Sequence, residues 1–147
     1  MKSIANGIAV IGVATFLGVM LCIGVTLGSY WRSLTAEAFI QWFTRNNGYV
    51  ARSVPIAVAP ALLGLVTSVV IDWGNSDGWL WLGSAACVVV VLALTGAYFV
   101  PTNRAFANGE VDVDDVPGRL RQWLGFHTVR IIVALGGAVL ACIALQA

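Results

Sequence analysis

The chain has 147 residues, of which 59% are hydrophobic and 10% are charged, and its mean hydropathy is +0.89. Soluble globular domains carry roughly 25% charged residues, so this composition excludes an ordinary soluble domain and predicts an integral membrane protein. The net charge of +1 and the lack of any basic run in the sequence exclude a nucleic-acid partner.

The first apolar segment, residues 4–28, runs for 25 positions without a charge. A helix needs roughly 20 apolar residues to cross a bilayer, whereas the apolar part of a secretory signal has only about 7–15. We therefore expect a membrane span. Gly24 and Gly28 form a G-x-x-x-G pair, which lets another helix approach closely. We expect this pair to serve packing inside the protein more than dimerisation.

Residues 35–45 have the pattern of a short amphipathic helix that lies at the membrane surface. Thr35 is a suitable N-cap. Aromatic side chains recur at helical spacing at Phe39, Trp42 and Phe43. The run at residues 46–48, Asn-Asn-Gly, is a breaker signal, so we expect the helix to end there. The segment fits either a connector at the membrane edge or a lid over a cavity between helices.

Residues 54–71 and 79–100 form the second and third apolar segments, joined by a short polar turn. Pro60 lies inside the second segment and predicts a kink, which membrane helices tolerate. Tryptophans on both sides of the turn are typical of a membrane interface. Pro101 follows the third segment, and we expect it to stop the helix or to begin a bend.

The fourth apolar segment, residues 131–145, has only 15 residues. At 1.5 Å per residue it covers about 22 Å, which is short of the ~30 Å hydrocarbon core. The helix must therefore reach back to about Trp123, and Pro117 suits its first turn. This length argument places His127 and Arg130 at or just below the membrane edge.

These segments predict an all-α membrane protein, a four-transmembrane-helix bundle with a short amphipathic interfacial helix between spans 1 and 2. We expect residues 1–147 to form a single integral membrane domain. The expected spans cover residues 4–28, 54–71, 79–100 and 123–145.

Basic residues are distributed unevenly between the two ends of such a bundle. The segments after spans 1 and 3 hold six arginines, whereas Lys2 is the one basic residue of the opposite side. Cytoplasmic loops of membrane proteins carry an excess of Lys and Arg. We therefore expect residues 29–53 and 101–122 in the cytoplasm and both termini outside, in the inner membrane of a bacterium.

Ionisable residues inside a span cost several kcal/mol when they face lipid. Trp123, His127 and Arg130 share one helix face, because they stand at positions i, i+4 and i+7. We expect this face to point into the bundle, although Arg130 is close enough to the membrane surface to snorkel. A lone histidine at a membrane edge is also often a structural hydrogen-bonding group.

Asn103 and Arg104 follow span 3 at a similar membrane depth, where Asn103 could also cap the helix end. Together with Trp42 and the face around His127, they predict a pocket with hydrogen-bond donors, one titratable base and aromatic walls. Such a pocket suits a flat apolar molecule that bears oxygens.

No metal motif accompanies these residues. The acidic stretch 109–115 lacks the spacing of a calcium-binding EF-hand loop, so we expect a solvated turn. One histidine cannot build a structural zinc site, although it could supply a haem ligand. The cysteines lie inside apolar segments, and we expect them to pack as small hydrophobic side chains rather than to form a Cys87–Cys142 bridge. They are Cys22, Cys87 and Cys142.

The order of these features resembles the anthrone oxygenase-like family of small integral membrane proteins. The likeness covers essentially the whole chain in layout and a short region in specific motifs. The matching residues are Pro101-Thr102-Asn103, Arg121-Gln122-Trp123, His127 and Arg130.

The resemblance implies oxidation of a lipophilic phenolic or anthrone-type substrate by O2, without a metal or flavin cofactor. An anthrone methylene is acidic because its carbanion is an aromatic enolate. His127 would then be the general base, and Arg130 and Asn103 would stabilise the enolate oxygen. The substrate-binding residues would be Trp123, Trp42 and Arg104.

Two other functions fit the same sequence. The chain could be a non-catalytic accessory subunit of a larger membrane complex, with its small-residue faces used between chains. Its partner would be another protein of that complex or, for a homo-oligomer, a second copy of the chain. It could also be a haem or metal protein that uses His127. Co-purifying partners would indicate the first of these functions, and a visible absorption spectrum with metal analysis would indicate the second.

Overall fold

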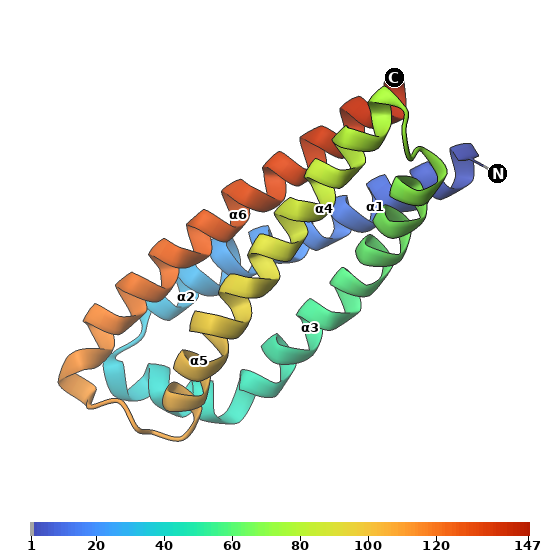
Figure 1. Cartoon of the computed structure of the whole chain (residues 1–147). Coiled ribbons are helices and arrows are strands. Elements are labelled where there is room, and N and C mark those ends of the chain that lie inside the picture. The colour runs from blue at the N-terminus through green and yellow to red at the C-terminus, as the bar shows by residue number, and fades with distance from the viewer. Residues whose placement is uncertain (1) are drawn as a thin grey trace.

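The computed structural model describes residues 2–147, apart from the side chains of residues 2, 3 and 76, and that part of the chain contains helices and no strand. Four long helical segments run side by side (Figure 1). Each is long and apolar enough to cross a membrane; they cover Ile4–Ser33, Ala36–Ile71, Asp77–Ala107 and Val113–Gln146. The predicted four-helix integral membrane protein is confirmed.

The first segment is built from three helical pieces. Helix α1 (Lys2–Leu21) continues into a π-helix, η1 (Cys22–Leu27), and then into α2 (Gly28–Ser33). A π-helix is a wider turn that is rare in proteins and is often found at functional sites. Gly24 and Gly28 lie in and just after η1, and both face side chains of the last helix. The predicted internal role of this glycine pair is confirmed.

Helix α3 (Ala36–Ile71) unites the predicted interfacial helix and the predicted second span. It begins as predicted, because the Thr35 Oγ1 accepts a hydrogen bond from a backbone N–H of the first turn at 3.3 Å. The predicted break at residues 46–48 is wrong. Buried side chains continue at helical spacing on both sides of it, and the Asn46 amide donates to the Trp42 carbonyl at 2.8 Å, so its polar group is satisfied within the helix.

The third segment contains α4 (Ser76–Leu94), a second π-helix η2 (Thr95–Phe99) and α5 (Val100–Ala107). The expectation that Pro101 stops the helix is wrong, since the chain stays helical as far as Ala107. Pro101 occupies the first turn of α5, directly after the wide π turn. Proline has no backbone N–H, and the first turn of a helix does not use this group in an internal hydrogen bond, so proline is tolerated there.

Helix α6 (Val116–Gln146) forms the fourth segment, preceded by the short 3-10 helix η3 (Val113–Asp115). Pro117 lies in its first turn, as predicted. The helix includes Trp123 and all residues up to the last apolar segment, which confirms that the fourth helix starts well before residue 131.

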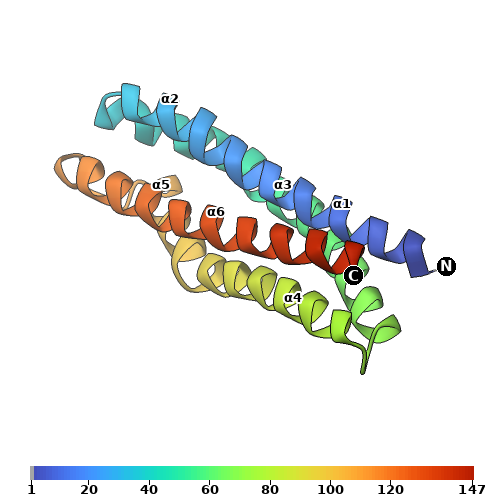
Figure 2. The same cartoon turned by 90° about the horizontal axis from the view of Figure 1, so that it is seen from above.

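The helices form a ring in which α1 contacts α3 and α6, and α4 contacts the same two helices (Figure 2). Close approach between α1 and α3 depends on glycine. A Cβ atom at Gly64 would lie 2.5 Å from the Cα of Ala9, and one at Gly12 would lie 2.7 Å from the Cα of Ala61. At both points the two backbones touch.

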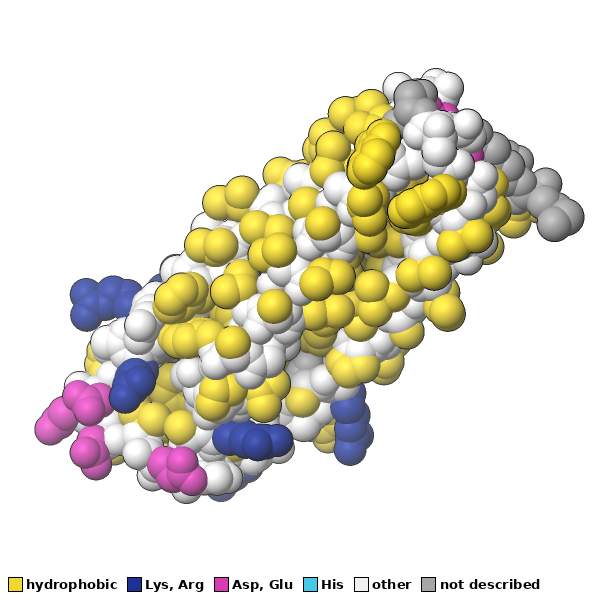
Figure 3. Space-filling model, viewed as in Figure 1, with side chains coloured by type: hydrophobic (Ala, Val, Ile, Leu, Met, Phe, Trp, Pro, Cys, Tyr) yellow, Lys and Arg dark blue, Asp and Glu magenta, His cyan; other side chains and the backbone are white. Residues whose placement is uncertain are grey.

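The outer surface of the bundle is apolar along its length, as expected for contact with lipid (Figure 3). Large exposed hydrophobic side chains are found on every long segment, including Ile11, Leu63, Val89 and Ile132. Arginine and acidic side chains gather at the end where α2, α5 and the start of α6 meet. The start of α1 and the end of α6 lie together at the opposite end (Figure 1).

Candidate functional site

His127 lies inside the bundle on α6 and is 1% exposed. Its Nε2 is 2.8 Å from the carbonyl oxygen of Met20 in α1, and its Nδ1 is 2.5 Å from Nη2 of Arg130 on the same helix. A carbonyl can only accept a hydrogen bond and a guanidinium can only donate one. Nε2 therefore donates, Nδ1 accepts, and both ring nitrogens are occupied.

Arg130 is also buried, at 2% exposure, and does not snorkel to the membrane surface. Its Nη1 donates to the Thr95 Oγ1 at 3.1 Å, and its Cζ lies 3.3 Å from the centre of the Phe99 ring. Its buried Nε makes no hydrogen bond. Within residues 2–147 no carboxylate pairs with this guanidinium. Buried charges are normally paired, so Arg130 is a buried cation held by neutral groups.

Trp123 connects this pair of residues to α5. Its ring stacks on the His127 ring, with centres 5.1 Å apart and planes 21° apart, and its Nε1 donates to the Asn103 Oδ1 at 2.8 Å. Asn103 lies within α5 rather than at its end, so it does not cap the helix. Its side chain instead joins α5 to α6 beside the buried arginine.

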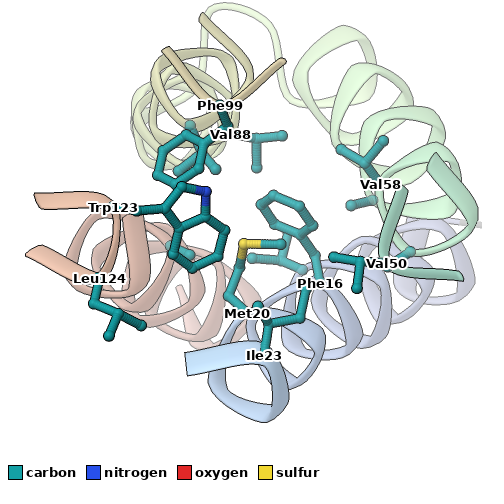
Figure 4. Close-up of a cluster of buried hydrophobic side chains, with 14 of the residues drawn as sticks. Phe16, Met20, Ile23, Val50, Val58, Val88, Phe99, Trp123 and Leu124 are labelled. Carbon is teal, nitrogen blue, oxygen red and sulfur yellow. The ribbon is translucent and has the colours of Figure 1, made fainter. Parts of the chain in front are cut away.

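Aromatic and apolar side chains from all four segments fill the bundle around these polar groups. Figure 4 shows Phe16, Met20, Phe99 and Trp123 pointing toward one another between the helices. A second aromatic cluster adjoins it, because Trp31 packs against Trp123 with ring centres 5.3 Å apart. The polar atoms of the site therefore sit in a region that is otherwise apolar.

A cavity of about 300 Å³ lies beside Arg130, between α3 and the η2–α5 part of the third segment. This volume is at the lower end of the ~300–1,000 Å³ range of ligand pockets. Its polar lining residues are Thr95, Asn103, Trp123 and Arg130, and its other lining residues are apolar. His127 is not among the lining residues, whereas Arg130 and Trp123, which both contact its ring, are.

The structure thus brings four of the six predicted site residues together. Trp42 lines a neighbouring cavity of about 280 Å³, and the two cavities share the side chains of Ile23 and Val50 as a common wall. Arg104 is exposed and is not part of the lining of either cavity. The predicted convergence of all six residues on one pocket is therefore only partial.

Sequence reasoning missed three contributors to the site. Thr95 is a polar residue within an apolar segment, and this position could have indicated a polar contact inside the bundle. The Met20 carbonyl has no signature of its own in the sequence. Gly24 was identified as a packing residue, but not as the residue that admits His127. A Cβ atom at Gly24 would lie 2.9 Å from Cδ2 and 3.2 Å from Nε2 of His127.

The arrangement can bind an oxyanion without binding a metal. Among the described residues, no group of three or more His, Cys, Asp or Glu side chains is placed to hold a metal ion. With one ring nitrogen donating and the other accepting, His127 offers no free lone pair to a haem iron. All three cysteines are free thiols, as predicted. The guanidinium of Arg130, whose two hydrogen-bond acceptors are neutral, is the group that can bind an anionic oxygen.

Comparison with known proteins identifies one family. Residues 39–140 match the family model described as anthrone oxygenase. The match covers more than half of the chain and includes most of α3, all of α4 and α5, and the part of α6 that carries the site. No curated protein and no solved structure matches the chain.

Proposed function

Because the chain belongs to the anthrone oxygenase family, we propose that it oxidises a lipophilic phenolic or anthrone-type substrate with O2, without a cofactor. The observation that carries this proposal is Arg130, a buried guanidinium oriented by neutral acceptors on the wall of a largely apolar cavity. Such a cavity favours a molecule with apolar rings and an oxygen that becomes negatively charged during the reaction.

Loss of a methylene proton turns an anthrone into an aromatic enolate with much of its negative charge on oxygen. In this proposal Arg130 stabilises that oxygen. Asn103 contributes its amide N–H, since its Oδ1 already accepts from Trp123. The enolate transfers one electron to O2, and the radical pair combines into a peroxide. Loss of water then leaves a quinone. One oxygen atom of O2 stays in the product, and the other leaves as water with both methylene hydrogens.

The base that takes the first proton regains its original state when water is lost, so the cycle consumes no reductant. The sequence assigns this step to His127, and the assignment stays a prediction. Nδ1 of His127 accepts a hydrogen bond from Arg130. His127 can therefore take a substrate proton only if Arg130 first leaves that nitrogen.

The cavity wall supports the lipophilic character of the substrate. Its lining includes Ala51, Pro55 and Val100, which are exposed on the outside of the bundle. Pro55 and Val100 also lie within the expected spans 54–71 and 79–100, so in this proposal that side of the cavity faces lipid. We propose that the substrate enters from the bilayer between α3 and α5.

O2 consumption by the purified protein in lipid nanodiscs, with anthrone as substrate, tests the proposal. Anthrones oxidise slowly by themselves, so protein-free nanodiscs give the background rate. Loss of an oxyanion-stabilising donor typically costs about 10²–10³-fold in rate, and we expect a loss of this order for Arg130→Gln. Arg119→Gln removes an exposed arginine from the same helix and should leave the rate unchanged.

Two results would contradict the proposal. One is a wild-type rate that does not exceed the background with anthrone or with hydroxylated anthrones. The other is an Arg130→Gln variant that consumes O2 as fast as the wild type.

A further inference from the structure

We infer that His127 is a positioning residue that acts through Arg130, by holding the guanidinium in the cavity wall with its charge free for an anionic oxygen of the ligand. The inference rests on the proposed function for the identity of the ligand. It differs from the sequence-based assignment of His127 as the base: the substrate proton passes to water instead and returns from water to the peroxide. The inference is carried by the contacts of the imidazole ring.

The first argument is the state of the ring. Its two nitrogens bind the Met20 carbonyl and Arg130, and one face is covered by Trp123. The ring does not line the cavity. A base must come within hydrogen-bonding reach of the proton it removes. Here the cavity wall holds Arg130, which occupies the accepting nitrogen of the ring.

The second argument is the way in which the ring is fixed. The bond to Met20 holds the tautomer in which Nδ1 is an acceptor. The approach of α6 to α1 that allows this bond requires glycine at position 24, since a Cβ atom there would meet the imidazole. Met20 itself lies just before the π-helix η1. The Met20 carbonyl, the π-helix that follows it and Gly24 thus all help to fix the orientation of the His127 ring.

The third argument is the neutrality of both hydrogen-bond acceptors of Arg130. The Thr95 hydroxyl donates its own proton to the Val91 carbonyl at 2.7 Å and so presents a lone pair to Nη1. In the same way, Nδ1 of His127 presents a lone pair to Nη2 of Arg130. A carboxylate in either place would neutralise the guanidinium, whereas neutral acceptors orient it and leave its charge uncompensated. A site built in this way suits a phenolate or enolate oxygen on a flat ring system.

The probe is 2-hydroxyanthraquinone, which absorbs at longer wavelength when its phenol ionises. In nanodiscs, at a pH at which the free dye is un-ionised, we expect the wild type to bind it with the spectrum of the phenolate. Arg130→Gln should bind the dye without this spectral change. The dye does not react with O2, so this measurement is independent of catalysis.

The decisive variant is His127→Gln. A glutamine amide has one oxygen acceptor and an N–H donor, so it can accept from Arg130 and donate to Met20, yet it is not a base. We expect His127→Gln to keep the phenolate spectrum, with dye affinity within about threefold of the wild type. His127→Leu, which loses both bonds, should bind the dye about tenfold to a hundredfold more weakly, as expected for a lost hydrogen bond to a charged group.

Thr95→Val provides a second test that does not alter the histidine. It removes the other neutral acceptor with little change in shape, and it should weaken dye ionisation in the same direction as His127→Leu. This variant decides the matter if His127→Leu does not fold.

The inference is overturned if His127→Gln ionises the dye normally but has lost O2 consumption, because His127 would then be the base. It is also overturned if His127→Leu and Thr95→Val ionise the dye as well as the wild type does. A wild type that ionises the dye but does not oxidise any anthrone would instead contradict the proposed function, and the dye spectra of the His127 and Thr95 variants would still decide the role of His127.

Discussion

Gly24 leaves room for the His127 ring because it has no Cβ atom. The helix η1 lies so close to α6 at this point that a Cβ atom would be 2.8 Å from Cδ1 of Ile131 and 2.9 Å from Cδ2 of His127. The isoleucine can rotate away, but the imidazole is held at both nitrogens and cannot. The space above Gly24 therefore determines where the ring, and through it Arg130, is placed.

The first residue-scale prediction follows from this contact. Gly24→Ala should push the His127 ring away from Met20 and lower the affinity for 2-hydroxyanthraquinone by about tenfold, the cost of one weakened hydrogen bond. The measurement is a dye titration followed by absorption. Gly18→Ala is the matched control, because Gly18 lies in the same segment with nothing within 4 Å of the added Cβ. Equal affinities of the two variants would show that the ring tolerates displacement.

The residues of the site were predictable to different degrees. The place of His127 and Arg130 within the fourth helix followed from the shortness of the last apolar segment, because a membrane sets a minimum helix length. Their partners were not predictable, since Met20 lies 107 positions away from His127 and Thr95 lies 35 positions away from Arg130. No local pattern encodes which carbonyl or hydroxyl a packed bundle brings to such a group.

At the level of elements, the two π-helices stand on opposite sides of the buried arginine and histidine. η1 begins just after Met20, which binds His127, and η2 begins at Thr95, which binds Arg130. Each wide turn thus coincides with a contact to α6. Sequence patterns do not distinguish these turns from ordinary α-helix, because the apolar runs continue through both of them.

The same limit explains the misplaced break in α3. Breaker signals describe a chain in water, where Asn and Gly compete with the helix for hydrogen bonds. In this chain Asn46 is satisfied within the helix, and Phe43 and Val50 are buried on either side of the predicted break. Most helical stability comes from packing of the apolar face, and burial of Phe43 and Val50 in the bundle therefore favours the continuous helix.

The contact between α1 and α3 yields a prediction about stability. At Gly64 an added Cβ would lie 2.5 Å from the Ala9 Cα, so Gly64→Ala must force the two backbones apart. Overpacking of this kind costs about 1–3 kcal/mol. We expect a lower midpoint of thermal unfolding in detergent. Gly48→Ala in the same helix meets no atom within 4 Å and serves as the control. A Gly64→Ala variant as stable as this control would exclude backbone contact at the crossing.

The whole molecule is polarised along its axis. Arginines and acidic residues gather at the end formed by α2, α5 and the start of α6 (Figure 3). The opposite end is held by the buried Asp72, whose Oδ2 accepts from Asn6 of α1 at 3.3 Å and from Trp81 of α4 at 3.1 Å. The positive-inside rule predicts that the arginine-rich end faces the cytoplasm. The side chain of Lys2, which enters that count, is outside the described residues.

Labelling of single cysteines in intact bacterial cells tests this orientation. With the native cysteines replaced by alanine, a membrane-impermeant maleimide should label Asn75→Cys, in the turn between α3 and α4, from outside. Glu110→Cys, in the turn between α5 and α6, should react only after the cells are opened. Both native side chains are exposed, so each variant controls the reactivity of the other. The reverse pattern would place the termini in the cytoplasm.

The proposed entry of the substrate from the bilayer, past Pro55 and Val100, has a consequence for how the protein meets its substrate. For a molecule dissolved in the bilayer, the rate of encounter depends on its mole fraction among the lipids rather than on its concentration in water. The membrane would then act as a second solvent that collects the substrate and delivers it in two dimensions. An organism could slow such a reaction simply by making more membrane, with the protein and the substrate pool unchanged.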